Sequence, residues 1–239
     1  MNAYGLTDRG LQRQLNEDSF YFKTSAVGPY PNLFIVADGM GGHNAGDFAS
    51  RYTVDCVVRA LESWSGDFLE GFKHAIKGAN DAVLSHSKIN PDLSGMGTTL
   101  VMISVWDDHY LAANVGDSRC YLFRDNHLTQ ISKDHSWVEE MCALGQLERD
   151  SEVYRARKNI ITRAVGASEE ILPDYFEGDI RDGDRFLLCS DGLTNMLSDR
   201  YIETILSMGD EPIRLAGKLV RSANEAGGSD NISVVLINP

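Results

Sequence analysis

Hydrophobic and polar residues follow two different periods in the first third of this chain. Apolar runs at residues 19–23 and 32–37 are short and rich in aromatic and β-branched residues, which is typical of strands. Residues 46–63 and 68–83 instead repeat their apolar residues every three or four positions, and this spacing predicts two amphipathic helices, the second ending before Pro91. The chain therefore begins as two strands followed by two helices.

The middle of the chain returns to the strand period. Residues 98–106, 110–115 and 119–123 are β-rich runs separated by short polar turns, and we expect them to form an antiparallel meander. A helix is predicted over residues 134–144, with Gly145 as its stop.

The last third mixes strands with a pair of helices. Its predicted strands lie near residues 160–165, 175–179, 185–190 and 231–237, and its helices near 201–208 and 211–225. Consecutive strands broken by paired helices fit hairpin-joined sheets better than regular strand–helix alternation. We predict an α+β fold with helices outside antiparallel sheets, and a single domain over residues 1–239, because no linker or repeat divides the chain.

The net charge of the chain limits the classes of partner that it can bind. With 35 acidic and 22 basic residues the net charge is -13, which disfavours nucleic acids and anionic membranes. No apolar run approaches the roughly 20 residues that cross a bilayer, and the first residues lack the pattern of an export signal, so we expect a cytoplasmic protein. The four scattered cysteines predict reduced core thiols and neither a zinc site nor a disulfide framework.

Four aspartates stand at the ends of predicted strands. Asp38, Asp117 and Asp191 each follow an apolar run, and Asp230 comes just before the last one. Each alone is typical of a hairpin turn. Together in one place, however, the four carboxylates would repel one another unless a cation or strong hydrogen bonds compensated them. All-oxygen ligands suit Mg²⁺ or Mn²⁺, and the spacing of a calcium-binding EF-hand is absent.

A glycine-rich loop over residues 38–46 joins a predicted strand to a predicted helix. It lacks the Lys of a P-loop, and Asn44 stands where the dinucleotide-binding pattern needs glycine. Its glycines would instead let the main chain approach a cation, with the carbonyl of Gly39 as a ligand.

A short charged segment near the start of the chain supplies a basic residue as well as two further acids. Arg13 carries a planar fork that can hold two phosphate oxygens, and Glu17 and Asp18 extend the set of carboxylates. Taken alone, this segment is typical of a solvated surface.

Seven sequence blocks together resemble the metal-dependent Ser/Thr protein phosphatases of the PPM (type 2C) family. The blocks are Arg13 to Asp18, Ala37 to His43 with Gly46, Gly97 to Leu100, Ala113 to Arg119, Ile161 to Gly166, Cys189 to Leu193 and Gly228 to Asn231. The chain is most similar to compact bacterial members, and the resemblance covers nearly all of it. It implies four layers, a sandwich of two antiparallel β-sheets flanked by pairs of helices.

The same resemblance implies a set of metal ligands. Asp38 would bridge two ions, Asp191 and Asp230 would bind one of them, and Glu17 and the carbonyl of Gly39 would bind the other. The implied cofactors are two or three divalent ions, Mn²⁺ or Mg²⁺.

The resemblance also implies roles for other residues at matching motif positions. Asp18 would hold a metal-bound water, Asp117 would join Asp191 at a third metal position, and Arg13 would bind the substrate phosphate. Some members carry a His directly after the Asp-Gly pair, where this chain has Met40. His43 would then serve as the acid for the leaving oxygen, unless it only forms local hydrogen bonds and a metal-bound water is the acid.

The implied activity is hydrolysis of phosphoserine and phosphothreonine in proteins, by a metal-bridged hydroxide that attacks phosphorus in line. The expected partners are phosphorylated proteins, including a bacterial Ser/Thr kinase and its substrates, and we expect a monomer. A polar flap segment, residues 145–159, would lie beside the site; its basic residues would attract phosphorylated segments or form a solvated loop.

Two other functions compete with this one. A regulatory module on a degenerate phosphatase fold predicts lost ligands, whereas every expected carboxylate is present. A calcium-stabilised structural domain explains the acidic strand ends but neither Arg13 nor the glycine loop.

Overall fold

Two antiparallel sheets form the centre of the molecule in the computed structural model, which describes residues 1–42, 45–149 and 151–239. The first sheet has the order β1 (Asn2–Asp8), β11 (Ile232–Asn238), β10 (Arg185–Cys189), β7 (Arg119–Arg124) and β8 (His127–Gln130). The second has the order β2 (Asp18–Lys23), β3 (Leu33–Met40), β5 (Leu100–Trp106), β6 (His109–Val115) and β9 (Asp174–Asp179), with the short β4 (Gly97–Thr98) beside β3.

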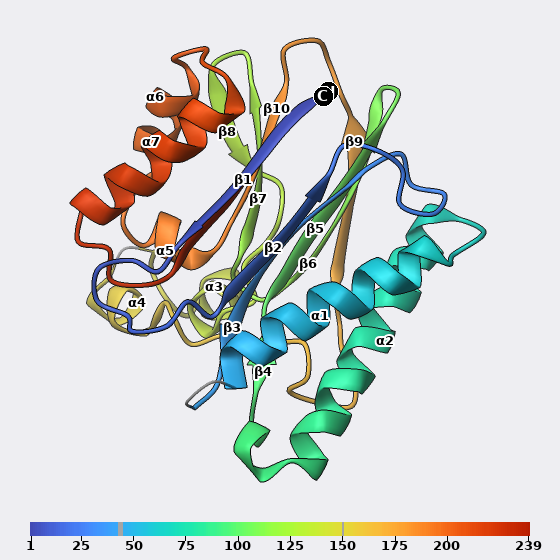
Figure 1. Cartoon of the computed structure of the whole chain (residues 1–239). Coiled ribbons are helices and arrows are strands. Elements are labelled where there is room, and N and C mark those ends of the chain that lie inside the picture. The colour runs from blue at the N-terminus through green and yellow to red at the C-terminus, as the bar shows by residue number, and fades with distance from the viewer. Residues whose placement is uncertain (43–44, 150) are drawn as a thin grey trace.

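Each sheet carries a pair of helices on its outer face (Figure 1). Helices α1 (Ala45–Glu62) and α2 (Phe68–Ile89) cover the second sheet, and α6 (Asp199–Leu206) and α7 (Pro212–Glu225) cover the first. Three short helices, α3 (Trp137–Ala143), α4 (Glu152–Arg157) and α5 (Asp191–Thr194), and a 3-10 turn (Pro91–Leu93) complete the described chain. The predicted α+β sandwich with four layers is confirmed.

Strand β3 shows why the inner strands are apolar without interruption. Phe34 and Val36 face the opposite sheet, while Leu33, Ile35 and Ala37 face α1 and α2. A strand that is buried on both faces needs apolar residues at successive positions, because side chains alternate between the faces.

The predicted meander is wrong in its third strand. Strands β5 and β6 pair as expected, but β7 crosses to the other sheet and pairs with β10, while β9 takes the place beside β6. Short turns mark where strands end, but the partner of each strand depends on contacts that are distant in the sequence.

Two predictions around residues 134–165 also need correction. The helix begins at Trp137, because Ser136 caps it and the Asp134 carboxylate is bound to Arg119 instead. Residues 160–165 form no strand and contribute only isolated bridges, Ile161 with Ser136 and Val165 with Thr98.

Other boundaries differ less. The flap segment, expected to be irregular, contains α4, and Gly145 follows α3 with a φ of 69°, as its role as a stop predicted. Strands β1 and β8 were not predicted from the sequence. Both lie in the first sheet, where pairing to β11 and β7 compensates their weak apolar patterns.

Candidate active site

The sheet topology collects the strand-end acids at one edge of the sandwich. Asp18 begins β2 directly opposite Asp38 in the antiparallel register of β3. Asp191 follows β10 and Asp230 precedes the adjacent, antiparallel β11, so these two also lie at a common edge. Asp117 follows β6, which runs parallel to β3 because both pair with the intervening β5.

The Asp38 and Asp18 carboxyls lie in a buried and mutually repulsive environment. Burial, and then the charges of Asp18, Asp191, Asp117 and Asp230, raise the pKa of Asp38 well above its usual range. Burial likewise raises the pKa of Asp18 to about 7, against the effect of its hydrogen bond with Ser190. The cause is the same in both: a buried negative charge with like charges nearby is unfavourable without a counter-ion.

Asp191 and Asp117 face a small cavity of about 200 Å³. Asn195, one turn further along the chain, donates a hydrogen bond of 2.9 Å to Oδ2 of Asp191. Burial and then the charge of Asp230 raise the pKa of Asp191. Burial and then the charge of Asp191 raise the pKa of Asp117 to about 8.

Glycines bring the main chain close to the acids. A Cβ atom at Gly39 would lie 2.0 Å from the carbonyl oxygen of Gly46, so no side chain fits there. A Cβ at Gly46 would lie 2.5 Å from Oε1 of Glu17. Glu17 is thus held against the start of α1, and its carbonyl accepts hydrogen bonds from Gly39 N–H (3.1 Å) and Ser50 Oγ (2.6 Å).

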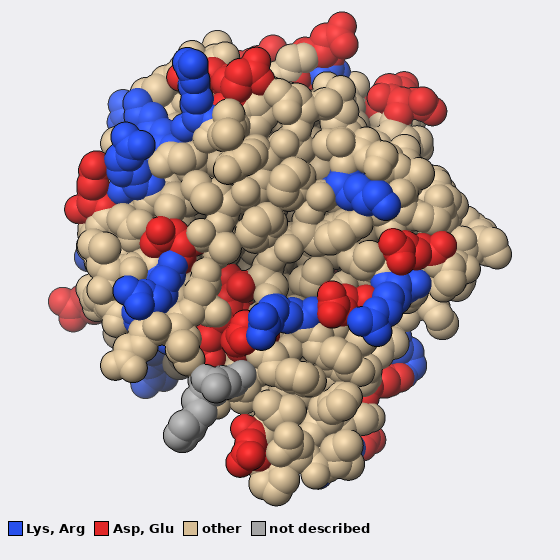
Figure 2. All heavy atoms as spheres, in the orientation of Figure 1, with Lys and Arg blue, Asp and Glu red and all other residues tan. Residues whose placement is uncertain are grey.

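Arg13 is the basic group at this edge. Its Nη2 donates to Oδ2 of Asp230 over 2.8 Å, and its Nη1 lies 4.0 Å from Oε2 of Glu17. The side chain is 48% exposed, so part of its planar fork is open to solvent. Acidic side chains gather on this face of the molecule with basic side chains beside them (Figure 2).

Three carboxyl oxygens test whether divalent ions fit here. Oε1 of Glu17, Oδ1 of Asp18 and Oδ1 of Asp191 are buried and have no hydrogen-bond partner. An unpaired buried oxygen is costly, and a hard cation or a water held beside one would satisfy it. Within residues 1–42, 45–149 and 151–239, no three acidic, His or Cys side chains converge tightly enough to enclose one ion by themselves. Carboxylate oxygens are the ligands that Mg²⁺ and Mn²⁺ prefer, and Mg²⁺ usually keeps several waters beside one or two carboxylates.

Most predicted site residues meet at this edge, namely Arg13, Glu17, Asp18, Asp38, Gly39, Asp117, Asp191 and Asp230. His43, the predicted acid, lies outside the described residues.

Three polar residues that hold the acids were not predicted from the sequence. Ser190 donates to Asp18, Asn195 donates to Asp191, and Asn231 accepts from the N–H of Glu17. The spacing of Asn195, four residues after Asp191, was a signal available in the sequence, because residues at that spacing meet on a helix. Ser190 and Asn231 lie inside two of the seven resemblance blocks, but their sequence neighbours do not show which groups they would hydrogen-bond.

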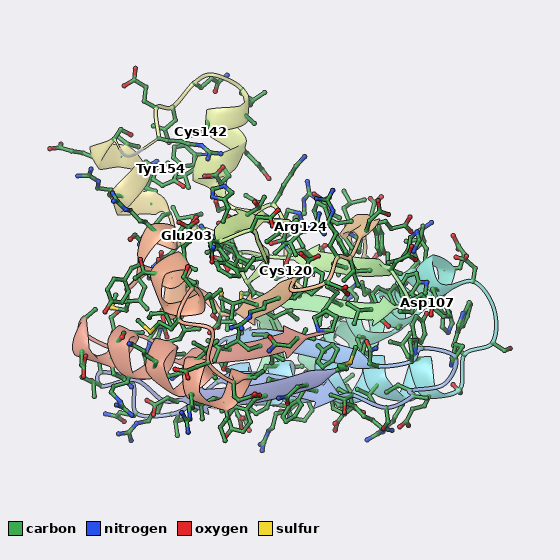
Figure 3. All side chains as sticks on the ribbon, turned by 90° about the horizontal axis from the view of Figure 1, so that it is seen from above. Asp107, Cys120, Arg124, Cys142, Tyr154 and Glu203 are labelled. Carbon is green, nitrogen blue, oxygen red and sulfur yellow. The ribbon has the colours of Figure 1, made fainter. Side chains whose placement is uncertain are left out.

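Part of the flap segment lines the small cavity, namely Tyr154, Arg155, Lys158 and Asn159. Figure 3 shows Tyr154 on α4 and Cys142 on α3, in the part of the chain that projects from the sheets. The hydroxyl of Tyr154 donates to Oε1 of Glu139 over 2.6 Å and thereby ties α4 to α3.

The basic residues of this segment have different partners. Arg149 pairs with Glu139, and the guanidinium of Arg157 lies 5.1 Å from the centre of the Trp137 ring. Arg155 and Lys158 instead line the cavity that Asp117 and Asp191 share. Of these four basic residues, only Arg155 and Lys158 therefore bring positive charge to the cavity that the acids line.

Comparison with known proteins shows the family of this chain. The profile of the protein phosphatase 2C family matches residues 10–226. The chain belongs to that family. It is therefore a protein phosphatase, and the relatives that it resembles are serine/threonine phosphatases.

Three relatives illustrate the similarity. The serine/threonine phosphatase stp of Listeria welshimeri is 37% identical over 99% of this chain and 95% of that protein. The solved serine/threonine phosphatase of S. agalactiae has a TM-score of 0.91 at 33% identity, over 98% of both chains. The catalytic domain of the phosphatase PstP, solved in complex with two manganese ions, has a TM-score of 0.85 at 36% identity, over 98% of this chain and 96% of that one.

One expectation concerns membranes. In the described part of the chain, no helix combines the length and the apolar character that crossing a bilayer requires.

Proposed function

We propose that this phosphatase removes phosphate from phosphoserine and phosphothreonine in proteins, using two or three bound Mn²⁺ or Mg²⁺ ions. The observation that carries the proposal is the set of unpartnered, buried carboxyl oxygens of Glu17, Asp18 and Asp191 at one edge, with Arg13 beside them. Carboxyl oxygens without partners beside a half-exposed arginine fit a site for cations and a phosphate.

The carboxylates would hold the ions, with Asp38 between the two principal sites. Glu17 and the Gly39 carbonyl would serve one site, Asp191 and Asp230 the other, and Asp117 with Asp191 a third. When bound, such ions supply an activated water and neutralise the charge of the phosphoryl oxygens. Asp18, kept in place by Ser190, would orient that water by hydrogen bonding.

Arg13 would position the substrate. A guanidinium can hold two oxygens of one phosphoryl group, and this fixes the phosphorus for attack in line with the departing Ser or Thr oxygen. Two groups are candidates for the acid that protonates this oxygen, His43 and a water. The kinetic effect of replacing His43 would separate the two, because a water acid leaves kcat unchanged.

Membership of the family supports a proposal about substrates and cellular context. We propose phosphorylated proteins as substrates, among them a bacterial Ser/Thr kinase and its targets, because the relatives that this chain matches are bacterial serine/threonine phosphatases. We further propose that residues 1–239 act as one domain and one monomer in the cytoplasm, with residues 145–159 as a flap beside the site.

One activity screen tests the function. Peptides containing phosphoserine, phosphothreonine or phosphotyrosine are incubated with the protein, with Mn²⁺ and with EDTA. We expect Mn²⁺-dependent release of phosphate from the first two, and loss of activity in EDTA. Activity that persists in EDTA, or release from phosphotyrosine alone, would refute the proposal.

A further inference from the structure

The turn that carries Asp117 has little freedom. Gly116 follows β6 with a φ of 101°, a conformation that residues with a side chain rarely adopt. A Cβ atom there would lie 2.7 Å from the methyl group of Thr99. Because Asp117 is the next residue and is only 9% exposed, the conformation of Gly116 determines where its carboxyl group lies.

His135 holds Gly116 on both of its main-chain polar groups. The N–H of His135 donates to the carbonyl of Gly116 over 2.9 Å, and the N–H of Gly116 donates to Nδ1 of His135 over 3.1 Å. Asn114 adds a bond of 3.0 Å from Nδ2 to the same carbonyl. His135 is 4% exposed, so water does not compete for these contacts.

The hydrogen bond from the Gly116 N–H determines which tautomer the His135 ring adopts. Nδ1 must carry a lone pair to accept this bond, so the proton of the neutral ring is on Nε2. Nε2 then faces Oδ2 of Asp174, an acceptor 3.4 Å away. Nη1 of Arg163 lies 3.3 Å from Nε2 but can only donate, so with the proton on Nε2 this second contact is not a hydrogen bond. Burial and then the charge of Arg163 lower the pKa of His135, which favours the same neutral ring.

We propose that His135 is a positioning residue for metal binding: its Nδ1 lone pair fixes the Gly116 turn and so keeps the Asp117 carboxyl beside Asp191, at the cavity that both line. The inference rests on the proposed role of Asp117 as a ligand. Residues that orient a ligand from behind typically change metal affinity by roughly 10- to 100-fold when they are replaced.

Three substitutions separate the two nitrogens of the ring. In His135→Asn the amide oxygen reaches the place of Nδ1 and can accept from Gly116. In His135→Gln the amide reaches the place of Nε2 and leaves the Gly116 N–H without a partner. His135→Ala removes both groups.

Calorimetric titration of Mn²⁺ into the metal-free protein is the decisive measurement. We expect His135→Gln and His135→Ala to weaken one class of Mn²⁺ sites by roughly 10- to 100-fold, and His135→Asn to restore the affinity to near the wild-type value. The loss of Mn²⁺ affinity in Asp117→Asn shows which class of sites contains Asp117. Adding His135→Gln to Asp117→Asn should cause little further loss, because both changes act on one site.

Two results would overturn the inference. One is wild-type Mn²⁺ binding in a folded His135→Gln variant, and the other is a loss in His135→Asn as large as in His135→Gln. If His135→Gln fails to fold, His135→Asn decides alone, since a tenfold weaker affinity there contradicts the role of Nδ1. Phosphatase activity enters none of these readouts, so a wild-type protein inactive on phosphopeptides would refute the proposed function and leave this test intact.

Discussion

Oδ1 of Asn231 accepts a hydrogen bond of 2.8 Å from the main-chain N–H of Glu17, which lies 214 residues away in the sequence. Its Nδ2 donates to the carbonyls of Arg9 and Leu15 over 2.9 and 2.8 Å. Asn231 is 3% exposed, and it therefore fastens the segment that carries Arg13 beside the start of β11.

Replacing Asn231 by Leu should destabilise the metal-free protein by about 2–4 kcal/mol, because three main-chain groups lose their partner. Urea denaturation measures the free energy of unfolding. Asn2→Ala, at an exposed position, is the control and should change it by less than about 0.5 kcal/mol. An equally small change in Asn231→Leu would show that water replaces these bonds.

Removing a bridging carboxylate should abolish activity without unfolding the protein. Asp38→Asn and Asp191→Asn are each expected to reduce Mn²⁺-dependent hydrolysis of a phosphothreonine peptide by at least roughly 100-fold. The metal-free variants should stay folded by circular dichroism, because the neutral amide relieves repulsion among the buried acids. Asp182→Asn, in an exposed turn, is the control. Near-normal turnover in either site variant would discredit the proposed ligands.

Arg13 should act mainly on substrate binding. We expect Arg13→Ala to raise KM by about tenfold, with a smaller effect on kcat, because the phosphate loses a ligand and the metal ligands remain. Arg13→Lys should recover only part of the loss, since an ammonium lacks the planar fork. Steady-state kinetics on one phosphopeptide gives both constants. Arg9→Ala removes a charge from the same segment, and a KM raised equally there would point to general electrostatic attraction instead.

The stability of the metal-free protein should fall as the pH rises. The folded-state pKa values of Asp18 (about 7) and Asp117 (about 8) lie above the value of an unfolded Asp, because both groups are buried near other acids. Their contribution to stability is full below about pH 4 and is lost as the pH rises through about 7 to 8.

Calorimetry in EDTA from pH 4 to 8.5 measures this loss as a falling Tm. Added Mn²⁺ should raise the Tm more at high pH, since the ions bind ionised carboxylates. Asp117→Asn should make the metal-free profile flatter. The same slope in Asp117→Asn and wild type would contradict the assignment to this group.

The flap segment offers a matched pair of arginines. Arg155 lines the cavity beside Asp117 and Asp191, whereas Arg157 is placed over Trp137. If the segment attracts phosphorylated sequences, Arg155→Ser should change kcat/KM ratios among phosphopeptides by several-fold, as an exposed charge typically contributes up to about 1 kcal/mol. Arg157→Ser should change them less. Identical selectivity in both variants and wild type would remove the flap from substrate choice.

Local patterns were sufficient for most elements of this chain. The spacing of apolar residues predicted α1, α2 and α7 to within two residues or so, because burial of one helix face requires that spacing wherever the helix packs. Asp38 within β3, and the acids that follow β6 and β10, were equally visible, since each comes directly after an apolar run in the sequence. Both features depend on neighbours only a few residues apart.

The pairing of strands, the limits of some elements and the placement of some polar residues depended on contacts that a local pattern does not contain. The crossing of β7 to the first sheet, the start of α3 at Trp137 and the absence of a strand at residues 160–165 follow from distant partners such as β10 and the Arg119–Asp134 pair. The same holds for Ser190 and Asn231, whose hydrogen bonds to Asp18 and Glu17 connect opposite ends of the chain. The residue types alone therefore indicated that acids would bind a cation, but the burial that raises their pKa values and leaves their oxygens unpaired exists only once the two sheets have packed together.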